Sequence, residues 1–568
     1  MEYIIFAAVM AGIVVLFIIK GLYDYKQSEK KFIRKRYSDY GVLPQREYKP
    51  EQFEAISHYF QKHADGFCID DITWNDLNMD EIFKKMNFTY SAAGEEYLYY
   101  LLRRPCMEKE ELFHREEIIR FFQEHADERV AYQVMYHKLG RTGKFSIYDY
   151  LDYLDGLGKR SNMPHYLALF LLAVSIGILF MDVTFGIVML VCVLAFNNVS
   201  YFKVKGEIDP YIISFAYVFR LLDAVKTLKA KTQKAESLKD EFEVLKKSSA
   251  SMGGFKRGAF IIMSGGRMSG SGNPLDMLLD FVRMGFHLDL IKFNQMLSET
   301  RKHISDIDNM ITIIGKIEAM IAIGEYRASL EEYCIPEFVG KTGLNAEELY
   351  HPLINEPVKN TIYTSSGILI TGSNASGKST FLKTVAINSL FAQTIHTCLA
   401  KRYETALFRM VSSMSLKDDV QSGDSYYMAE IKSIKRILDL TLSEGIPVLC
   451  FVDEVLRGTN TVERIAASTQ ILKSLCRNNC ICFAATHDIE LTHLLEGIFD
   501  NYHFTEKIEE NDISFTYKIM DGRASSRNAI RLLGIMGYEP AIIGEAEKMA
   551  ADFLVSGVWH RLDYQNAQ

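Results

Sequence analysis

The sequence has neither an excess of positive charge nor a paired cysteine motif. Its 568 residues carry 64 Lys and Arg against 72 Asp and Glu, a formal net charge of -8. That balance excludes a protein coated in positive charge for nucleic acid, while a local basic surface stays compatible with it. The nine cysteines are scattered, and the closest group, Cys476, Cys480 and Cys482, lacks C-x-x-C spacing. We interpret them as reduced core thiols in a cytosolic compartment and predict no metal site there.

Charge is also missing from three long apolar segments, of which residues 3–19 are the first. This run has about the minimum length that crosses a bilayer as a helix. A cleavable signal peptide carries its positive charge before the apolar run, whereas here the positive side chains follow it. They are Lys20, Lys26, Lys30, Lys31, Arg34, Lys35 and Arg36. The pattern predicts a retained transmembrane anchor at 1–20, with the cytoplasm on its C-terminal side.

The other two apolar runs, 166–181 and 183–196, are separated by Asp182. Positive residues flank the pair: Lys159 and Arg160 before it, Lys203 and Lys205 after it. We predict a transmembrane hairpin at 165–197 with both ends in the cytoplasm. A buried helical hairpin in a soluble core is the alternative, since each arm is short. We favour the membrane because the charge pattern agrees for all three runs.

The remaining sequence up to about residue 340 has mainly helical patterns. Residues 21–164 form a predicted cytoplasmic helical region, and residues 198–340 a helical lever or core. The second region contains a long helical pattern from Pro274 to about Glu331. A glycine-rich stretch at 253–272 precedes it and lacks the Lys-Ser/Thr pair of a phosphate-binding loop, so we assign it no chemistry. The chain exceeds the roughly 250–300 residues of one core, which predicts several domains.

A phosphate-binding loop follows the short apolar strand expected at 367–370, and a helical pattern follows the loop from Phe381. Its residues fit G-x-x-x-x-G-K-[ST] with one further Thr: Gly372, Ser373, Asn374, Ala375, Ser376, Gly377, Lys378, Ser379 and Thr380. The glycines let backbone N–H groups turn toward phosphates, and the helix N-terminus adds a favourable dipole. Lys378 is predicted to reach the β- and γ-phosphates of ATP, and Ser379 to ligate Mg²⁺.

Two further apolar strands end in polar residues. The strand expected at 446–452 runs into Asp453 and Glu454, which we assign to the metal and to the general base. The strand at 480–485 ends in Thr486 and His487, where a polar side chain can sense the γ-phosphate. A lone His at a strand end is more often structural. Because strands of an open α/β sheet bind ligands at their carboxyl ends, these residues are expected to converge.

The order of motifs from His351 to Ala550 resembles the ATPase domain of the MutS family of DNA mismatch repair proteins. The matching segments are the phosphate-binding loop, 391–393, 418–419, 422–430, 452–459, 485–487, 517–518 and 522–527. Upstream, segments 89–94 and 101–105 resemble the start of the family's helical core, from about residue 70, and 333–338 its end.

This resemblance implies an α/β P-loop ATPase domain of the ABC-like, MutS type at 341–568, after a mainly α-helical core or lever region. It implies hydrolysis of ATP to ADP and phosphate with Mg²⁺, and it supports His487 as a catalytic residue. It also implies a homodimer in which Ser425 of one protomer completes the phosphate site of the other. A simple N-cap role for Ser425 is compatible with that.

The sequence departs from the family before the core. The stretch up to about Asp70 is too short for the mismatch-reading domain, and we find no Phe-x-Glu wedge in an equivalent setting. We therefore expect no side chain to be inserted at a mismatch.

Two functions are compatible with these features. One is a dimeric, ATP-driven DNA clamp or sensor for mismatched or branched DNA, with a basic run at Lys226, Lys229, Lys231 and Lys234 as candidate phosphate contacts. The other is a membrane-tethered ATPase switch that acts on a protein or lipid partner without DNA. Both place the protein in the cell membrane as a multi-pass protein with a cytoplasmic ATPase domain. A transporter half is set aside, because three short helices are too few and no Leu-Ser-Gly-Gly signature precedes Asp453.

Overall fold

The computed structural model describes residues 2–561 except 144, 232–235, 256–281, 374–375, 415–425, 477–478, 510–511, 525–529, 531–532 and 535. The chain divides into two compact units. The helical unit comprises Met1–Asp65, Phe83–Leu101 and Phe113–Leu330, and the α/β unit comprises Gly66–Ile82, Leu102–Leu112 and Glu331–Gln568. The expected combination of a helical region with an α/β domain is confirmed.

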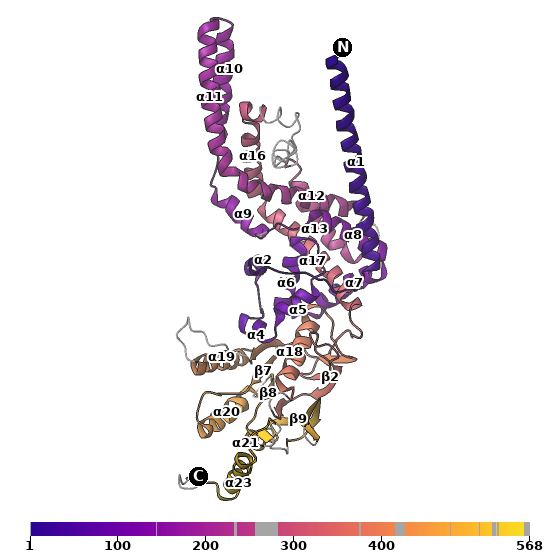
Figure 1. Ribbon diagram of the computed structural model, residues 1–568, viewed down its shortest axis with the longest axis vertical. Coiled ribbons are helices and arrows are strands. Elements are labelled where there is room, and N and C mark those ends of the chain that lie inside the picture. The colour runs from indigo at the N-terminus through magenta and orange to yellow at the C-terminus, as the bar shows by residue number, and fades with distance from the viewer. Residues whose placement is uncertain are drawn as a thin grey trace. The chain divides into compact units, whose positions relative to one another are not determined.

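The helical unit is built around α17 (Ile304–Ala328), which is buried along nearly its whole length and packs against α8, α12 and α13. Its other elements surround this helix or extend from it (Figure 1). They are α1 (Glu2–Ser38), α2 (Pro50–Ile56), α3 (His58–His63), α6 (Ala92–Arg103), α7 (Lys109–Glu124), α8 (Ala126–Leu139), α9 (Ile147–Gly156), α10 (Met163–Leu179), α11 (Val183–Ile208), α12 (Ile212–Lys231), α13 (Lys239–Ser251) and α16 (Leu288–Lys302), with 3-10 turns at Asp209–Tyr211 and Glu236–Leu238.

The single helix expected from Pro274 to about Glu331 is interrupted. It is divided at His303, whose φ of -118° and ψ of 26° leave the helical region between α16 and α17. Residues 274–281 lie outside the part of the chain that the structure describes.

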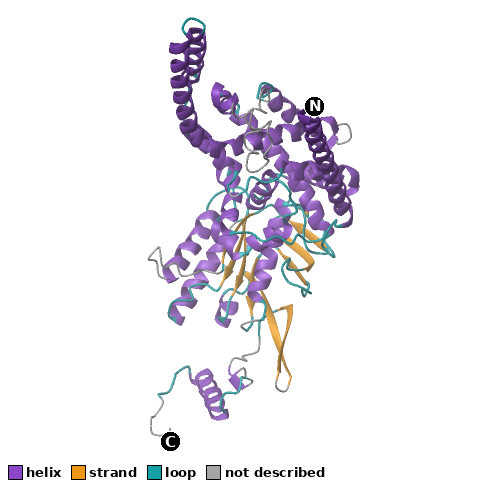
Figure 2. Ribbon diagram, turned by 45° about the horizontal axis from the view of Figure 1, so that its top comes forward, coloured by secondary structure: helices purple, strands orange, loops and turns teal. Residues whose placement is uncertain are grey.

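The apolar hairpin forms as two long helices, α10 and α11, that lie side by side (Figures 1 and 2). Asp182 caps α11 by accepting a hydrogen bond from the backbone N–H of Phe185 at 3.0 Å. Gly186 permits the close approach, because a Cβ there would lie 2.5 Å from the Cα of Leu179. Large apolar side chains are exposed along both helices, including Phe170, Phe185 and Val191.

The expectation of three membrane spans needs correction. Among the described residues, one helix, Val183–Ile208, is long and apolar enough to cross a membrane, and 11% of its apolar window is buried. Its partner Met163–Leu179 is a shorter apolar helix of 17 residues, at the lower end of the about 17–25 residues that cross a bilayer. The first expected span lies in α1, where most apolar side chains are outside the described residues.

The α/β unit contains two sheets. The six-stranded sheet has the order β10-β9-β4-β8-β7-β6, in which β9, β4, β8, β7 and β6 are parallel and β10 is antiparallel to β9. Its strands are β4 (Gly367–Thr371), β6 (Arg409–Ser413), β7 (Val448–Asp453), β8 (Cys480–Ala485), β9 (Phe499–Glu509) and β10 (Asp512–Asp521). A smaller sheet has the order β1-β5-β2-β3, from β1 (Glu337–Phe338), β2 (Leu344–Leu349), β3 (Asn360–Thr364) and β5 (Arg402–Thr405).

Helices cover the central strands of the large sheet (Figure 2). The helix α18 (Lys378–Thr394) packs on β7 and β8, while α19 (Tyr426–Thr441) and α20 (Thr461–Leu475) share one apolar cluster with β4, β6, β7 and β8. Two shorter or outlying helices complete this part of the unit: α21 (Ile489–Leu494) and α23 (Pro540–Ser556). The three predicted strands at 367–370, 446–452 and 480–485 are confirmed as β4, β7 and β8, and they are neighbours.

Two segments from early in the sequence, Gly66–Ile82 and Leu102–Leu112, belong to the α/β unit. One contains α4 (Asp71–Asp76) and the first residues of α5 (Met79–Met86), and α4 packs on β6. The buried carboxylate of Asp76 accepts hydrogen bonds from the hydroxyl of Ser412 at 2.7 Å and from the backbone N–H of Met414 at 2.9 Å. Asp76 therefore fixes the end of β6, directly before the segment 415–425.

Candidate nucleotide site

The phosphate-binding loop connects β4 to α18, as the motif predicts. Gly372 and Gly377 have φ values of 141° and 108°, which residues other than glycine rarely adopt. A Cβ at Gly372 would also lie 2.8 Å from the carbonyl oxygen of Phe504. Asn374 and Ala375 lie outside the described residues, whereas Ser373, Ser376 and Thr380 frame the loop. The turn therefore depends on glycine at both positions.

Lys378 is held inside this loop. Its ammonium group donates hydrogen bonds to the carbonyl oxygens of Gly372 and Ser373, each at 2.8 Å. Burial lowers the pKa of Lys378, while the nearby carboxylates of Asp453 and Glu454 oppose that shift. A cation enclosed by backbone carbonyls and N–H groups at a helix N-terminus suits an incoming phosphate.

The predicted metal ligands meet across two strands. The hydroxyl of Ser379 donates a hydrogen bond of 2.5 Å to Oδ2 of Asp453. The second carboxylate oxygen of Asp453, Oδ1, is buried and has no hydrogen-bond partner among the residues that the structure describes. Hard oxygen donors of this kind are the ligands that Mg²⁺ prefers. These two residues thus fit a magnesium ion.

Glu454 follows directly, and its carboxylate contacts the side chains of His487 and Arg457. Its Oε1 lies 3.0 Å from Nε2 of His487, and its Oε2 forms an ion pair with Arg457. Burial by itself would raise the pKa of Glu454, but the hydrogen bond to His487 and the charge of Arg457 outweigh it and the pKa is lowered. Glu454 is therefore an ionised carboxylate, and it lines the same cavity as Lys378 and Ser379.

The loop after β7 has an unusual backbone. Glu454 and Leu456 have φ values of 56° and 61°, in the left-handed region that costs non-glycine residues about 1–3 kcal/mol each. The N–H of Glu454 donates a hydrogen bond to the carbonyl oxygen of Ala485 at 2.9 Å. The hydroxyl of Ser468 donates one to the carbonyl oxygen of Val455 at 3.1 Å. Neighbouring strand and helix thus hold this conformation.

Residues of the phosphate-binding loop and residues that follow β7 and β8 line one cavity of about 620 Å³. Ser376, Gly377, Lys378, Ser379 and Thr380 contribute one wall, and Glu454, Arg457 and His487 contribute another. The volume lies within the range of small-molecule sites. The structure therefore brings the predicted phosphate, metal and base residues together in one pocket.

Sequence reasoning left the adenine-binding residue unassigned, and the structure brings Tyr517 into the same cavity. Tyr517 lies in the irregular part of β10, between Phe515 and Ile519, with a φ of 50°. Asn360 holds this irregularity by donating to the carbonyl oxygen of Tyr517 at 3.0 Å and accepting from the N–H of Ile519 at 2.9 Å. Tyr517 is 46% exposed, and its ring lies beside Gly377. Among the described Phe and Tyr residues that line the cavity, Phe381 and Phe504 are buried, so Tyr517 is the exposed one to which an adenine has access.

Ser425, the residue expected to complete the partner's site, lies outside the described residues. The helix α19 begins at the next residue, Tyr426. Further along α19, Arg436 forms an ion pair with Asp70 and donates to the carbonyl of Ser412. The helix that continues the Ser425 segment is therefore fixed to the same region as α4.

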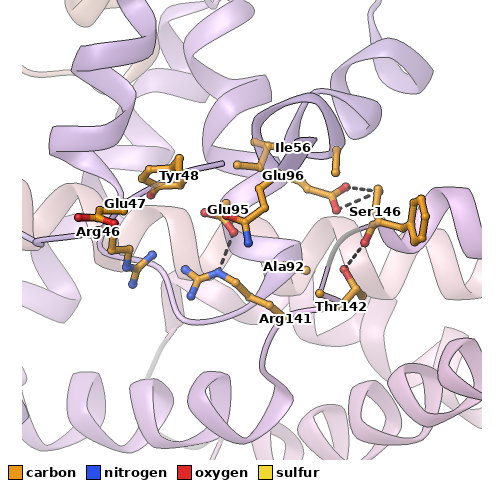
Figure 3. Close-up of a pocket in the computed structure, with 14 residues that line it drawn as sticks. Arg46, Glu47, Tyr48, Ile56, Ala92, Glu95, Glu96, Arg141, Thr142 and Ser146 are labelled. Atoms are coloured by element: carbon orange, nitrogen blue, oxygen red, sulfur yellow. Dashed lines mark hydrogen bonds and ion pairs between the residues drawn. The ribbon is translucent and has the colours of Figure 1, made fainter. Parts of the chain in front are cut away.

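A second cavity, of about 300 Å³, lies within the helical unit (Figure 3). Arg46 and Arg141 both donate to the carbonyl oxygen of Thr89, and Arg141 also forms an ion pair of 2.7 Å with Glu95. Across the cavity, both carboxyl oxygens of Glu96 lie 2.9 Å from the hydroxyl of Ser146. Burial raises the pKa of Glu96 well above its ordinary value, although the hydrogen bond from Ser146 opposes the shift. The polar groups of this cavity bind one another, and we assign it no ligand.

Comparison with known proteins identifies the α/β region. Residues 368–554 match the model of MutS domain V. The match covers the phosphate-binding loop, Asp453, Glu454, His487 and Tyr517, and it extends through most of α23.

Individual MutS proteins are similar to slightly less than half of the chain. The DNA mismatch repair protein MutS of Clostridium kluyveri is 28% identical over 292 residues, which cover 48% of this chain and 33% of that protein. The Thermotoga maritima DNA mismatch repair protein MutS is 29% identical over 264 residues, covering 45% and 33%. The human MutS protein homolog 4 is 27% identical over 285 residues, covering 46% and 30%. The chain thus spans about a third of the length of these curated relatives.

Proposed function

We propose that this protein is a membrane-attached ATPase that acts as a dimeric, ATP-driven clamp or sensor for DNA. The observation that carries the ATPase proposal is the convergence of Lys378, Ser379, Glu454 and His487 in one cavity, with Asp453 hydrogen-bonded to Ser379 beside it. The match of this region to MutS domain V supports the same reaction, hydrolysis of ATP to ADP and phosphate.

Each residue of the cavity has a distinct role in this proposal. Lys378 and the loop amides bind the β- and γ-phosphates, and Tyr517 stacks on the adenine. Ser379 and Asp453 hold Mg²⁺, which supplies positive charge to the phosphate oxygens when bound. Glu454, ionised and oriented by His487, accepts the proton of the attacking water.

Two arguments support the proposed dimer. One is the set of exposed apolar side chains on α23, and the other is the composite ATP site that the resemblance to the MutS family implies. No residue of α23 is buried, and Ile542, Leu554, Val555 and the nearby Trp559 are exposed. Exposed apolar side chains of this kind favour association. In mixed dimers, Ser425→Ala in one protomer is expected to impair hydrolysis at the partner's site. An effect confined to the mutated protomer's own nucleotide would contradict the composite site.

Membrane attachment is proposed from the apolar hairpin α10–α11. Its large apolar side chains are exposed, and Arg160 at its base forms an ion pair with Glu207 near the end of α11. Positive residues on both sides favour a location in the cell membrane, multi-pass, with the α/β unit in the cytoplasm. Sedimentation of membranes from the host tests this, because the protein should leave the supernatant.

DNA is the proposed ligand because the relatives that match are DNA mismatch repair proteins by name. In the basic run, Lys226 is exposed on α12, while the side chains of Lys229, Lys231 and Lys234 lie outside the described residues. The test is binding of the detergent-solubilised protein to paired, mismatched and branched DNA across a salt series, with and without ATP. Tight, salt-dependent binding that ATP changes supports the clamp.

The second candidate is a membrane-tethered switch that acts on a protein or lipid partner without DNA. The exposed apolar helix α11 favours it, since a DNA clamp has no need of a bilayer. Absence of DNA binding at low salt by a protein that still hydrolyses ATP would select this candidate.

A further inference from the structure

The carboxylate of Glu430 contacts the backbone of the loop that carries Glu454. Glu430 lies in the second turn of α19 and is 3% exposed. Its Oε1 accepts hydrogen bonds from the N–H of Leu456 at 2.5 Å and from the N–H of Arg457 at 3.2 Å. These two amides follow Glu454 by two and three residues.

The contact occurs where the backbone needs support. Glu454 and Leu456 both have positive φ values, and such conformations persist only when the surroundings fix them. The second oxygen of Glu430 is buried and makes no hydrogen bond within the described part of the chain. The loop also approaches α19 closely at Gly458, where an added Cβ would lie 3.3 Å from the Cβ of Tyr427 in that helix. Removal of Glu430 would leave the buried N–H of Leu456 and the partly buried N–H of Arg457 without this acceptor.

We propose that Glu430 is a positioning residue, which acts through the backbone of Leu456 and Arg457 to hold Glu454 in its productive place. This inference rests on the proposed ATPase function. Glu430 does not touch the nucleotide cavity itself, whereas Glu454 and Arg457 line it. Because a displacement of about 1 Å in a reacting group can reduce a rate 10²-fold, a shift of this loop reduces turnover. Phosphate binding by Lys378 and the loop of Gly372–Gly377 is unaffected.

The same contact gives α19 a direct mechanical connection to the catalytic base. Glu430 is the fifth residue of α19, about 6 Å along the helix from its first residue, Tyr426. Glu430 therefore connects the first turns of α19 to the loop that carries Glu454.

The test compares Glu430→Ala and Glu430→Gln with a matched control, Asp439→Ala. Asp439 is an acidic residue of the same helix, exposed and paired with Lys435. We expect Glu430→Ala to lower kcat by roughly tenfold or more, with the Kd for nucleotide changed less than about twofold. Glu430→Gln retains an oxygen that accepts both N–H groups, so it should keep kcat near that of the parent, as should Asp439→Ala.

Three results would overturn the proposal. They are an unchanged kcat in Glu430→Ala, an equal loss in Glu430→Gln, and a loss of nucleotide binding that matches the loss of turnover. Hydrogen–deuterium exchange at 454–458 separates this proposal from the ATPase proposal itself. If the parent binds no ATP, the proposed function fails. Faster exchange of these amides in Glu430→Ala alone would then still identify Glu430 as the support of the loop, and unchanged exchange would refute that role too.

Discussion

Nε2 of His487 lies 3.0 Å from Oε1 of Glu454, so the end of β8 directly contacts the end of β7. Arg457 binds the other oxygen of the same carboxylate. Glu454 thereby has a fixed orientation and a lowered pKa, although burial alone would raise it. A general base of this kind is ionised throughout the neutral range.

The pH dependence of turnover tests this contact. A general base works when it is deprotonated, so activity is lost as the pH falls through the pKa of Glu454. Because the hydrogen bond to His487 lowers that pKa, His487→Ala should raise it and move the acidic limb of the pH–kcat/KM profile to higher pH. His493→Ala, at an exposed position of α21, is the matched control and should leave the limb in place. An identical acidic limb in His487→Ala and the parent contradicts the contact.

Lys378→Ala should weaken nucleotide binding as well as hydrolysis. The ammonium group lies within the loop between Gly372 and Ser373, where it can bind phosphate in the ground state and in the transition state. Asp453→Asn is the informative partner variant, because it should lower the affinity for Mg²⁺ while binding of nucleotide alone persists. Titration of a fluorescent ATP analogue with and without Mg²⁺ measures both. Equal affinity of the Lys378→Ala protein and the parent would refute the assignment.

Cys192 reports on the location of α11. It is an exposed cysteine within the apolar part of this helix. In intact membranes a water-soluble maleimide should label Cys192 much more slowly than a cysteine introduced at Lys435 on α19, which is exposed. Detergent should remove the difference. Equal labelling rates in intact membranes would show that α11 faces water or a protein partner.

Stability of the helical unit should fall as the pH rises through neutrality. Burial raises the pKa of Glu318 on α17 to about 7, against an ordinary value of 4.5, although hydrogen bonds from Ser91 and Tyr90 oppose the shift. The folded state therefore keeps a proton that the unfolded chain releases, and the stability from Glu318 is present below pH 4.5 and lost as the pH rises through about 7.

Glu318→Gln should accordingly reduce the difference in thermal midpoint between about pH 5 and about pH 8. Glu299→Gln, at a position 42% exposed on α16, is the matched control and should retain the full difference. The same pH dependence in Glu318→Gln and in the parent would mean that Glu318 ionises normally in the folded state.

Much of the α/β site follows from the sequence because its signals are local. The strand at 480–485 is found at the predicted residues, since an apolar run covered on both faces is bounded by polar residues at each end. The roles of Lys378, Ser379 and Asp453 follow from motif spacing, and the parallel order of β4, β8 and β7 brings them together.

The features that sequence reasoning missed depend on contacts between distant segments. Tyr517 reaches the cavity only because β10 is irregular there, and Asn360, more than 150 residues earlier, fixes that irregularity. No motif spacing in the sequence indicates that Glu430 accepts hydrogen bonds from the backbone amides of Leu456 and Arg457. Likewise, nothing near Asp76 indicates that it binds Ser412 and Met414. Among the described residues one helix, α11, has the length and composition of a membrane span, and α10 is shorter, because an apolar run in the sequence does not fix where its helix begins and ends.

The most direct test of the account is a comparison of ATP binding and phosphate release by the parent and Glu454→Gln, in the detergent-solubilised full chain. Gln keeps the shape of the side chain but cannot accept a proton, so the account predicts unchanged ATP affinity and turnover reduced by roughly 10²-fold or more. Hydrolysis by Glu454→Gln at the parent rate would contradict the central claim that Glu454 is the general base of this cavity.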